Sequence, residues 1–195
     1  MAGSSWERSS GVSVSVSGVS VEAVQYIPMS WEEYLATPEH PRHEWVDGVV
    51  VVSPDPIWRH QRIARRLANL FDQVENLYGS SSGNIKLPGN RVRIPDAYAT
   101  MQPEGLFIER PVLVVEVLSP STRTEDLVRK APEYAAAGIS QFWVVDPERR
   151  TLEVHHLVDE GWETLVLLDD HRPRAEIAIA DHGVVTVDLP DLLDG

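Results

Sequence analysis

The sequence predicts an α/β fold in which a mixed β-sheet is flanked by helices. Two observations carry this prediction. The expected elements follow one another as helix, hairpin, long helix, strands, helix and strand, an order typical of a sheet covered by helices. The chain has 195 residues, of which 43% are apolar, and this suits one domain with its own core.

The N-terminal segment, residues 1–26, is predicted to be a flexible Ser/Val-rich tail ahead of a single domain at 27–195. Residues 9–21 alternate Val with Ser and lack large side chains. Residues 1–10 have neither the basic stretch nor the apolar run of a secretion signal. No apolar run reaches the roughly 20 residues that a membrane span needs. We therefore expect a soluble, cytoplasmic protein that does not contact membranes.

A short helix and a hairpin open the domain. Ser30 and Glu33 form a capping-box pattern that begins a helix over Ser30–Ala36, and Pro38 ends it. Asp47-Gly48 is a strong turn signal for a hairpin, and its strands are expected at His43–Val46 and Val49–Val52.

The clearest helix pattern runs from about Ile57 to Tyr78 and stops at Gly79. Its apolar residues recur at helical spacing: Ile63, Leu67, Leu70, Val74 and Leu77. Residues 79–83 are rich in Gly and Ser and are expected to form a loop. Two short strands follow around Pro88-Gly89, at Ile85–Leu87 and Arg91–Ile94.

Val112–Leu118 is a nearly unbroken β-branched run, as expected of a central strand that is buried on both faces. A second helix is predicted over Glu125–Ala137, opened by a Thr122/Glu125 capping box and ended by Gly138. Pro132 inside it should kink the helix or move its start. The remaining strands are expected at Phe142–Val145, Leu152–Val158 and Glu163–Leu168.

The charge balance argues against a protein that holds nucleic acid with its whole surface, because the formal net charge is −13. From Asp146 to Gly195, thirteen acids face four arginines, so this segment alone carries −9. Two local stretches are basic: Arg59, Arg62, Arg65 and Arg66, and then Lys86, Arg91 and Arg93. A nucleic acid could dock there, although the first stretch also fits the solvated face of an amphipathic helix.

Three residues suggest a chemical site. Glu116 interrupts a run that otherwise reads as buried, and an ionised carboxylate there is costly unless it is paired or bound to a metal. Asp96 follows Pro95 where a strand gives way to a loop, which is also a common place for a plain turn aspartate. Lys130 lies near Leu127 and Tyr134 on a helical wheel, at the margin of the stripe that faces the sheet. It could snorkel to solvent or reach the strand ends.

Several other chemistries lack support. The chain has no cysteine, so any metal must sit on oxygen or imidazole ligands. His155 and His156 are adjacent on a predicted strand and should point to opposite faces, which prevents them from chelating one metal. The motifs of serine hydrolases, P-loop enzymes and dinucleotide-binding folds are absent from the sequence. Four tryptophans are expected in the core rather than as base-stacking platforms: Trp31, Trp45, Trp58 and Trp143.

Asp96, Glu116 and Lys130 with their surroundings resemble the PD-(D/E)XK nuclease superfamily, and within it the Uma-two family of restriction endonuclease-like proteins, a former domain of unknown function. The resemblance spans about Ile27 to Val158. The superfamily places a lysine two residues after the glutamate, where this chain has Leu118, and Lys130 on the next helix takes its place. The stretches that carry the resemblance are HEWVDGVVVVSP (43–54), RHQRIARRL (59–67), RIPDAY (93–98) and VVEVLSPSTRTEDLVRKAPEYAAAGISQFWVVDP (114–147).

The resemblance implies a restriction-endonuclease-like fold and a metal-dependent endonuclease that hydrolyses phosphodiester bonds of DNA. Asp96, Glu116 and the carbonyl of Val117 would hold magnesium or manganese. Lys130 would orient water or stabilise developing charge, and Glu44 would bind a second metal or assist through a water. Glu44 also fits an exposed strand glutamate paired with Arg42 or His43. The residues considered for phosphate contact are His60, Gln61 and Arg62, and a solvated histidine near a helix start is the plainer interpretation of the first.

Three functions follow as hypotheses. The first is the magnesium-dependent endonuclease. The second is a nucleic-acid-binding or protein-binding module of the same fold with a weak or inactive site, and the third is a hydrolase of a small phosphorylated substrate. A homodimer is an expectation, because nucleases that cut both strands often need two sites.

Overall fold

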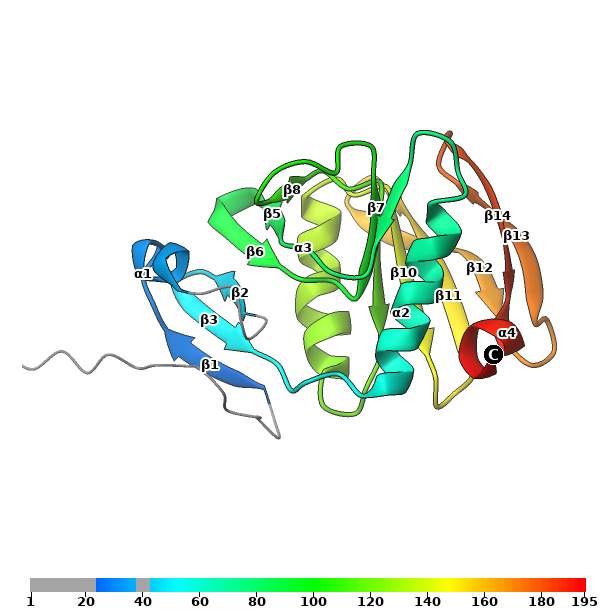
Figure 1. Cartoon of the computed structure of the whole chain (residues 1–195), viewed down its shortest axis with the longest axis horizontal. Coiled ribbons are helices and arrows are strands. Elements are labelled where there is room, and N and C mark those ends of the chain that lie inside the picture. Colours follow the sequence, from blue (N-terminus) through cyan, green and yellow to red (C-terminus); the bar gives the residue numbers. More distant parts are fainter. Residues whose placement is uncertain (1–23, 38–42) are drawn as a thin grey trace, which may run out of the picture.

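A six-stranded mixed sheet forms the centre of the computed structural model, which describes residues 24–37 and 43–195 (Figure 1). The strand order is β12-β11-β10-β9-β7-β4. β9 (Leu113–Val117) is central, because it pairs in parallel with β10 and antiparallel with β7. The predicted mixed sheet and its central strand are confirmed. The other strands are β4 (Tyr78–Ser80), β7 (Ala97–Thr100), β10 (Gln141–Asp146), β11 (Thr151–Val158) and β12 (Gly161–Leu168).

A second sheet has the order β1-β3-β2-β6-β5-β8. The predicted hairpin lies within it, and both turn residues, Asp47 and Gly48, have positive φ, as such tight turns require. The capping box of Ser30 and Glu33 opens α1 (Trp31–Ala36) as predicted. The strands are β1 (Gln25–Pro28), β2 (His43–Val46), β3 (Val49–Val52), β5 (Ile85–Leu87), β6 (Arg91–Arg93) and β8 (Ile108–Glu109), with the short helix η1 (Pro88–Asn90) between β5 and β6.

The N-terminal boundary differs from the expectation by two residues. Gln25 and Tyr26 were expected in the tail, but they pair with β3 as part of β1. The rest of the predicted tail and Pro38, the expected end of α1, lie outside the described residues.

Helices cover both faces of the central sheet. Alternate β9 residues Leu113, Val115 and Val117 share a core with α2 (Trp58–Phe71) and α4 (Leu189–Asp194). Val114 between them belongs to the opposite core, with α3 (Ala131–Ala136). Because side chains alternate along a strand, Glu116 lies on the α3 side, inside the protein.

The long helix ends earlier than its apolar spacing predicts. α2 stops at Phe71, and residues 72–77 form turns, although Val74 and Leu77 are still buried. The Asp72 carboxylate accepts the N–H of Gly79 at 2.8 Å, and this contact turns the chain back onto the helix. A Cβ at Gly79 would collide with the Ala68 carbonyl oxygen, so only glycine allows this close approach. Residues 78–80, partly expected as a loop, therefore form β4.

The helix with Pro132 is continuous because its first part is wound more loosely. η2 (Glu125–Lys130) is a π-helix, in which the Ala131 N–H donates to the Asp126 carbonyl five residues back, and α3 follows directly. Pro132 lies in the first turn of α3, directly after the π-helix. The expected Thr122/Glu125 capping box is wrong, because Ser119 accepts the Thr122 N–H instead and Glu125 is buried.

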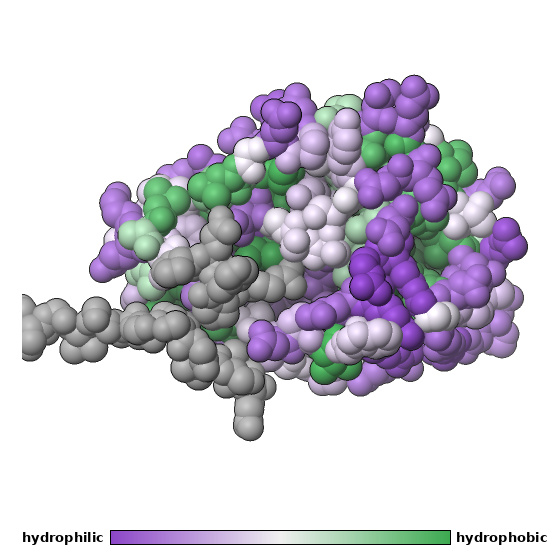
Figure 2. Space-filling view, in the orientation of Figure 1, coloured by the Kyte–Doolittle hydropathy of each residue, from purple (hydrophilic) through white to green (hydrophobic). Residues whose placement is uncertain are grey.

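The C-terminal region adds elements that the sequence did not indicate. β13 (Arg174–Ile179) and β14 (Gly183–Asp188) form a two-stranded sheet that contributes to the α2 side core, and α4 follows. Three α2 arginines reach this end of the chain. Arg66 donates to the carbonyls of Asp191, Leu192 and Gly195, Arg62 donates to Leu193, and Arg59 pairs with Asp194. Figure 2 shows hydrophilic residues gathered over α2 on the face in view.

Tryptophan burial differs from the expectation at one position. Trp45 and Trp143 are buried, and Trp31 packs on the apolar cluster of the hairpin, as expected. Trp58 is 66% exposed, so its placement in the core was wrong. Within residues 24–37 and 43–195, the helices are all too short or too polar to cross a membrane.

Candidate active site

The site begins with Lys130, whose ammonium is surrounded by carboxylates. Its Nζ lies 3.1 Å from Glu44 Oε1, 3.1 Å from Glu116 Oε1 and 3.2 Å from Asp126 Oδ1. These side chains come from β2, β9 and η2, and all of them are buried. Tyr134 on α3 donates its hydroxyl to Glu116 Oε1 at 2.7 Å. We call Glu44, Glu116, Asp126 and Lys130 the carboxylate cluster.

Asp96 joins the site from the start of β7 rather than from the end of the preceding strand. Its N–H donates to the Val115 carbonyl, and its Oδ2 accepts the Val117 N–H at 2.7 Å. The backbone of β9 thus fixes Asp96 beside Glu116. His60, near the start of α2, places Nε2 3.1 Å from the same Asp96 oxygen and also bonds to the Val117 backbone.

Within residues 24–37 and 43–195, Asp96 and Glu116 each have one carboxylate oxygen without a hydrogen bond or ion pair. The contacts of Asp96 end on Oδ2, and those of Glu116 end on Oε1. Asp96 and Glu116 line one cavity of about 240 Å³, together with His60, Asp126 and Lys130. Asp96 is 13% exposed at its side chain and Glu116 only 1%, so the cavity leads inward from Asp96.

The pKa values of three groups of the cluster are raised by their surroundings: Glu116, Asp126 and Lys130. Burial and the charges of Asp126, Asp96 and Glu44 raise the pKa of Glu116 well above its usual value, although Lys130 opposes this. Burial likewise raises the pKa of Asp126. Burial would lower the pKa of Lys130, but the surrounding carboxylates outweigh it and raise this pKa well above normal. Lys130 is therefore charged, and negative charge is crowded around Glu116.

Asp96 and His60 form an ion pair at the mouth of the cavity. Burial acts to raise the pKa of Asp96, but the hydrogen bond and charge of His60, with Lys130, hold it below its usual range. Burial acts to lower the pKa of His60, but Asp96 outweighs it, and the pKa is raised. Asp96 is thus ionised at neutral pH.

A buried arginine supports the cluster from behind. Arg93 is 1% exposed and donates to Glu44, Glu125 and Glu133 at 2.7 to 2.9 Å. Glu44 accepts from Lys130 and the Ile94 N–H on Oε1 and from Arg93 on Oε2, so its two oxygens are engaged. The interpretation of Glu44 as an exposed strand glutamate is therefore wrong.

The structure brings together most of the predicted residues and adds others. Asp96, Glu116, Lys130, Glu44 and His60 line one cavity, whereas Gln61 and Arg62 line a neighbouring one. The helical wheel placed Lys130 near Tyr134 and Leu127, at the margin of the face toward the sheet. Tyr134 is buried as expected, but Leu127 is exposed because the π-helix rotates this turn. Sequence reasoning missed Asp126 and Arg93. Asp126 precedes Lys130 by four residues, a spacing that brings side chains together on a helix and could have indicated the pair.

The donor set fits a hard divalent cation. It consists of carboxylate and backbone oxygens with an excess of negative charge, and such ligands suit magnesium or manganese. Within the described residues, however, the His, Asp and Glu side chains do not form a group of three already arranged as a ligand shell. Lys130 instead sits among the carboxylates. A divalent cation bound at the other oxygens of Asp96 and Glu116 would share the negative charge of these two carboxylates with Lys130.

A mixed sheet flanked by helices, with this site beside its central strand, defines the restriction-endonuclease-like class of fold. The chain belongs to the Uma2 family, described as "Putative restriction endonuclease", whose match covers residues 31–181. It is 32% identical over 161 residues to an uncharacterized protein of Synechocystis sp., covering 76% of this chain and 84% of that protein. It is also similar to a crystal structure from Anabaena variabilis described as "a putative nuclease belonging to DUF820". That likeness has a TM-score of 0.68 and 20% identity, and covers 85% of this chain and 98% of the other.

Proposed function

We propose that the protein is a metal-dependent endonuclease that hydrolyses phosphodiester bonds of DNA. The observation that carries the proposal is the pair Asp96 and Glu116, which contact or belong to β9 and line one cavity together with Lys130. Buried carboxylates crowded together in this way make physical sense chiefly around a cation. The family supports the choice of reaction.

The residues take different roles in the proposed reaction. Asp96, Glu116 and the Val117 carbonyl would hold magnesium or manganese, which supplies an activated water and stabilises charge on phosphate oxygens. Lys130, kept charged by its carboxylate partners, would stabilise the negative charge that develops on the phosphate. Glu44 positions Lys130. One Glu44 oxygen contacts the Lys130 ammonium and the Ile94 N–H, and the other accepts from Arg93, so the carboxylate is held in place. His60 holds Asp96 in its ionised form.

The test is metal-dependent nicking of supercoiled plasmid by the purified chain, compared with Asp96→Asn, Glu116→Gln and Lys130→Met. We expect each substitution to lower the nicking rate by about 10²- to 10⁴-fold, the range seen when a positioned catalytic group is removed. EDTA should abolish nicking by the unaltered chain. Nicking at the original rate in all three variants would refute the site.

Asp146→Asn provides a matched control. Asp146 is a buried carboxylate at the end of β10, next to β9, but it pairs with Arg123 and does not line the cavity. Its removal should leave nicking within a few-fold of the unaltered chain. An equal loss in this variant would mean that any buried strand carboxylate affects the assay through folding.

A binding module of the same fold is the second candidate, and one observation favours it. Lys130 is already occupied by three carboxylates, and within the described residues no ligand shell is preformed. Binding of DNA without metal-dependent nicking would support this candidate. Release of phosphate from nucleotides, without nicking, would instead support the small-substrate hydrolase. The homodimer stays a prediction, which sedimentation equilibrium would test.

A further inference from the structure

Trp58 is the most conspicuous residue that the proposed reaction does not use. It lies in the first turn of α2 with 66% of its surface exposed. Arg62, four residues later, places its guanidinium carbon 4.6 Å from the centre of the indole ring. This cation–π contact holds the ring in place on the helix surface. A large aromatic ring that is both exposed and fixed is a ready stacking surface.

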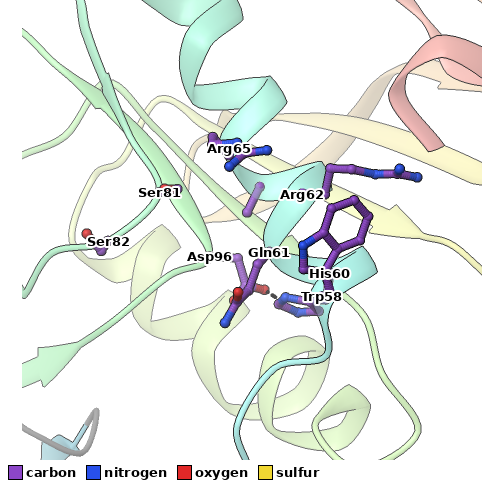
Figure 3. Close-up of a pocket in the computed structure, with 9 residues that line it drawn as sticks. Trp58, His60, Gln61, Arg62, Arg65, Ser81, Ser82 and Asp96 are labelled. Atoms are coloured by element: carbon purple, nitrogen blue, oxygen red, sulfur yellow. Dashed lines mark ion pairs between the residues drawn. The ribbon is translucent and has the colours of Figure 1, made fainter. Parts of the chain in front are cut away.

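A cavity of about 490 Å³ lies beside this ring and is distinct from the carboxylate cavity. His60 and Asp96 line both cavities, so the two adjoin at the mouth of the candidate active site. In Figure 3, Trp58 stands on one side of His60 and Asp96, and Ser81 and Ser82 stand on the other. The volume lies within the range of pockets that hold small organic ligands.

The lining of this cavity matches the parts of a nucleotide. Arg65 is exposed and makes no ion pair or hydrogen bond within residues 24–37 and 43–195, so its charge is available for a phosphate. Gln61, Ser81 and Ser82 offer amide and hydroxyl groups that can donate to or accept from a base edge. Trp58 supplies the ring on which a base can stack.

We propose that this cavity binds the unpaired nucleobase of a nucleotide next to the phosphodiester that is cut, with Trp58 stacking on the base and Arg65 contacting its phosphate. The inference rests on the proposed function for the position of the cut. Stacking on an aromatic ring requires a base that is out of a duplex, and it tolerates any sequence because every base has a π-face. The proposal therefore predicts a preference for single-stranded or locally opened nucleic acid.

The experiment measures fluorescence anisotropy in EDTA at low salt, where cleavage does not occur. The probes are a fluorescein-labelled 15-mer of thymidylate, a 15-mer of abasic deoxyribose phosphate, and the 15-base-pair duplex of the same thymidylate strand. We expect the unaltered chain to bind thymidylate about tenfold more tightly than the abasic strand, from one stacked base. Trp58→Ala should remove this difference, whereas Trp58→Phe should keep most of it.

Two further variants separate stacking from charge and from folding. Arg65→Ala should weaken binding of the thymidylate and abasic strands by the same factor, because it acts on phosphate. Leu106→Ala, which removes a similarly exposed apolar side chain in the loop before β8, should leave binding of all three probes unchanged. Thymidylate should quench tryptophan fluorescence in the unaltered chain, and Trp58→Phe should lose that quenching while it still binds.

Three results with the unaltered chain would overturn the inference: equal affinity for the thymidylate and abasic strands, tighter binding of the duplex than of the single strand, or binding of none of the probes. Full discrimination between the two strands by Trp58→Ala would overturn it as well. These outcomes are independent of the nicking assay. A chain that binds as expected but does not nick plasmid would refute the proposed function and retain the base site. A chain that nicks plasmid while Trp58→Ala still discriminates would refute the base site alone.

Discussion

Two regions of the molecule are rich in charge, and they differ in what neutralises it. In the carboxylate cluster and around Arg93, cations and carboxylates are buried and contact one another. On the arginine face of α2, which comprises Arg59, Arg62, Arg65 and Arg66, the guanidinium groups lie at or near the surface. Three of them contact the C-terminal end of the chain, and Arg65 is the one of the four that makes no ion pair or hydrogen bond within the described residues.

The difference shows that a run of charged residues in a sequence does not reveal its partner. Moving a charge out of water is expensive, so buried charges must find their partners within the fold. Surface arginines carry no such requirement, since water solvates them whether or not they meet a ligand. The buried region therefore supports a functional conclusion more firmly than the basic helix does.

The largest effect on stability is expected for Arg93→Met. Arg93 neutralises Glu44, Glu125 and Glu133 in the interior, and its removal leaves buried carboxylates without a cation. Breaking a buried ion pair on one side costs about 3–5 kcal/mol. Urea denaturation followed by tryptophan fluorescence should show a loss of this size in the free energy of unfolding.

Arg65→Met is the matched control for this prediction, because it removes the same group from the exposed face of α2. It should change the free energy of unfolding by less than about 0.5 kcal/mol. Equal losses in Arg93→Met and Arg65→Met would abolish the distinction between the two regions.

A smaller effect of opposite sign is expected for Glu116→Gln without metal at neutral pH. Burial and neighbouring carboxylates raise the pKa of Glu116, so its ionised form opposes folding. The neutral amide removes this opposition, and we expect the free energy of unfolding to rise by roughly 0.5–2 kcal/mol, the usual range for stabilising substitutions. The variant would thus gain stability as it loses nicking activity.

The pH dependence of this gain has a definite sign. Below the ordinary pKa of glutamate, 4.5, the carboxyl is neutral in the folded and unfolded chains and costs nothing. As the pH rises above that value the unfolded chain ionises first, so this group destabilises the fold progressively. The difference between Glu116→Gln and the unaltered chain should therefore widen from pH 4.5 to pH 7. A difference that narrows over this interval would show that Lys130 stabilises ionised Glu116 more than burial opposes it.

Much of the fold could be predicted from the sequence because local signals and tertiary packing agree. The capping box of α1, the Asp47-Gly48 turn and the β-branched run of β9 each specify one structure. The end of α2 could not be predicted, because Val74 and Leu77 keep the helical spacing while the chain turns back at Gly79. The π-helix at η2 has no period of its own in the sequence.

The candidate site was only partly predictable for a related reason. Glu116 stands out because a charge in a buried strand breaks the usual pattern, and Lys130 required the family resemblance. Arg93 and Asp126 look like ordinary surface residues of a strand and a helix, and only the tertiary arrangement shows that they are buried. Trp58 was misplaced because an exposed aromatic residue leaves the same apolar signal as a core residue.

The smallest effect separates two neighbours on α2. Arg66→Ala removes hydrogen bonds to the carbonyls that end α4, and we expect a loss of about 1 kcal/mol, or a fall of about 2–4 °C in Tm. Arg65→Ala should leave Tm unchanged but lower the slope of log affinity against log salt for the thymidylate 15-mer by about 0.7, the value for one phosphate contact on a single strand. Differential scanning calorimetry and a salt titration of anisotropy measure the two effects. If Arg66→Ala changed the salt slope and Arg65→Ala did not, the phosphate contact would belong to Arg66. Arg66 would then have to leave the α4 carbonyls in order to bind the phosphate.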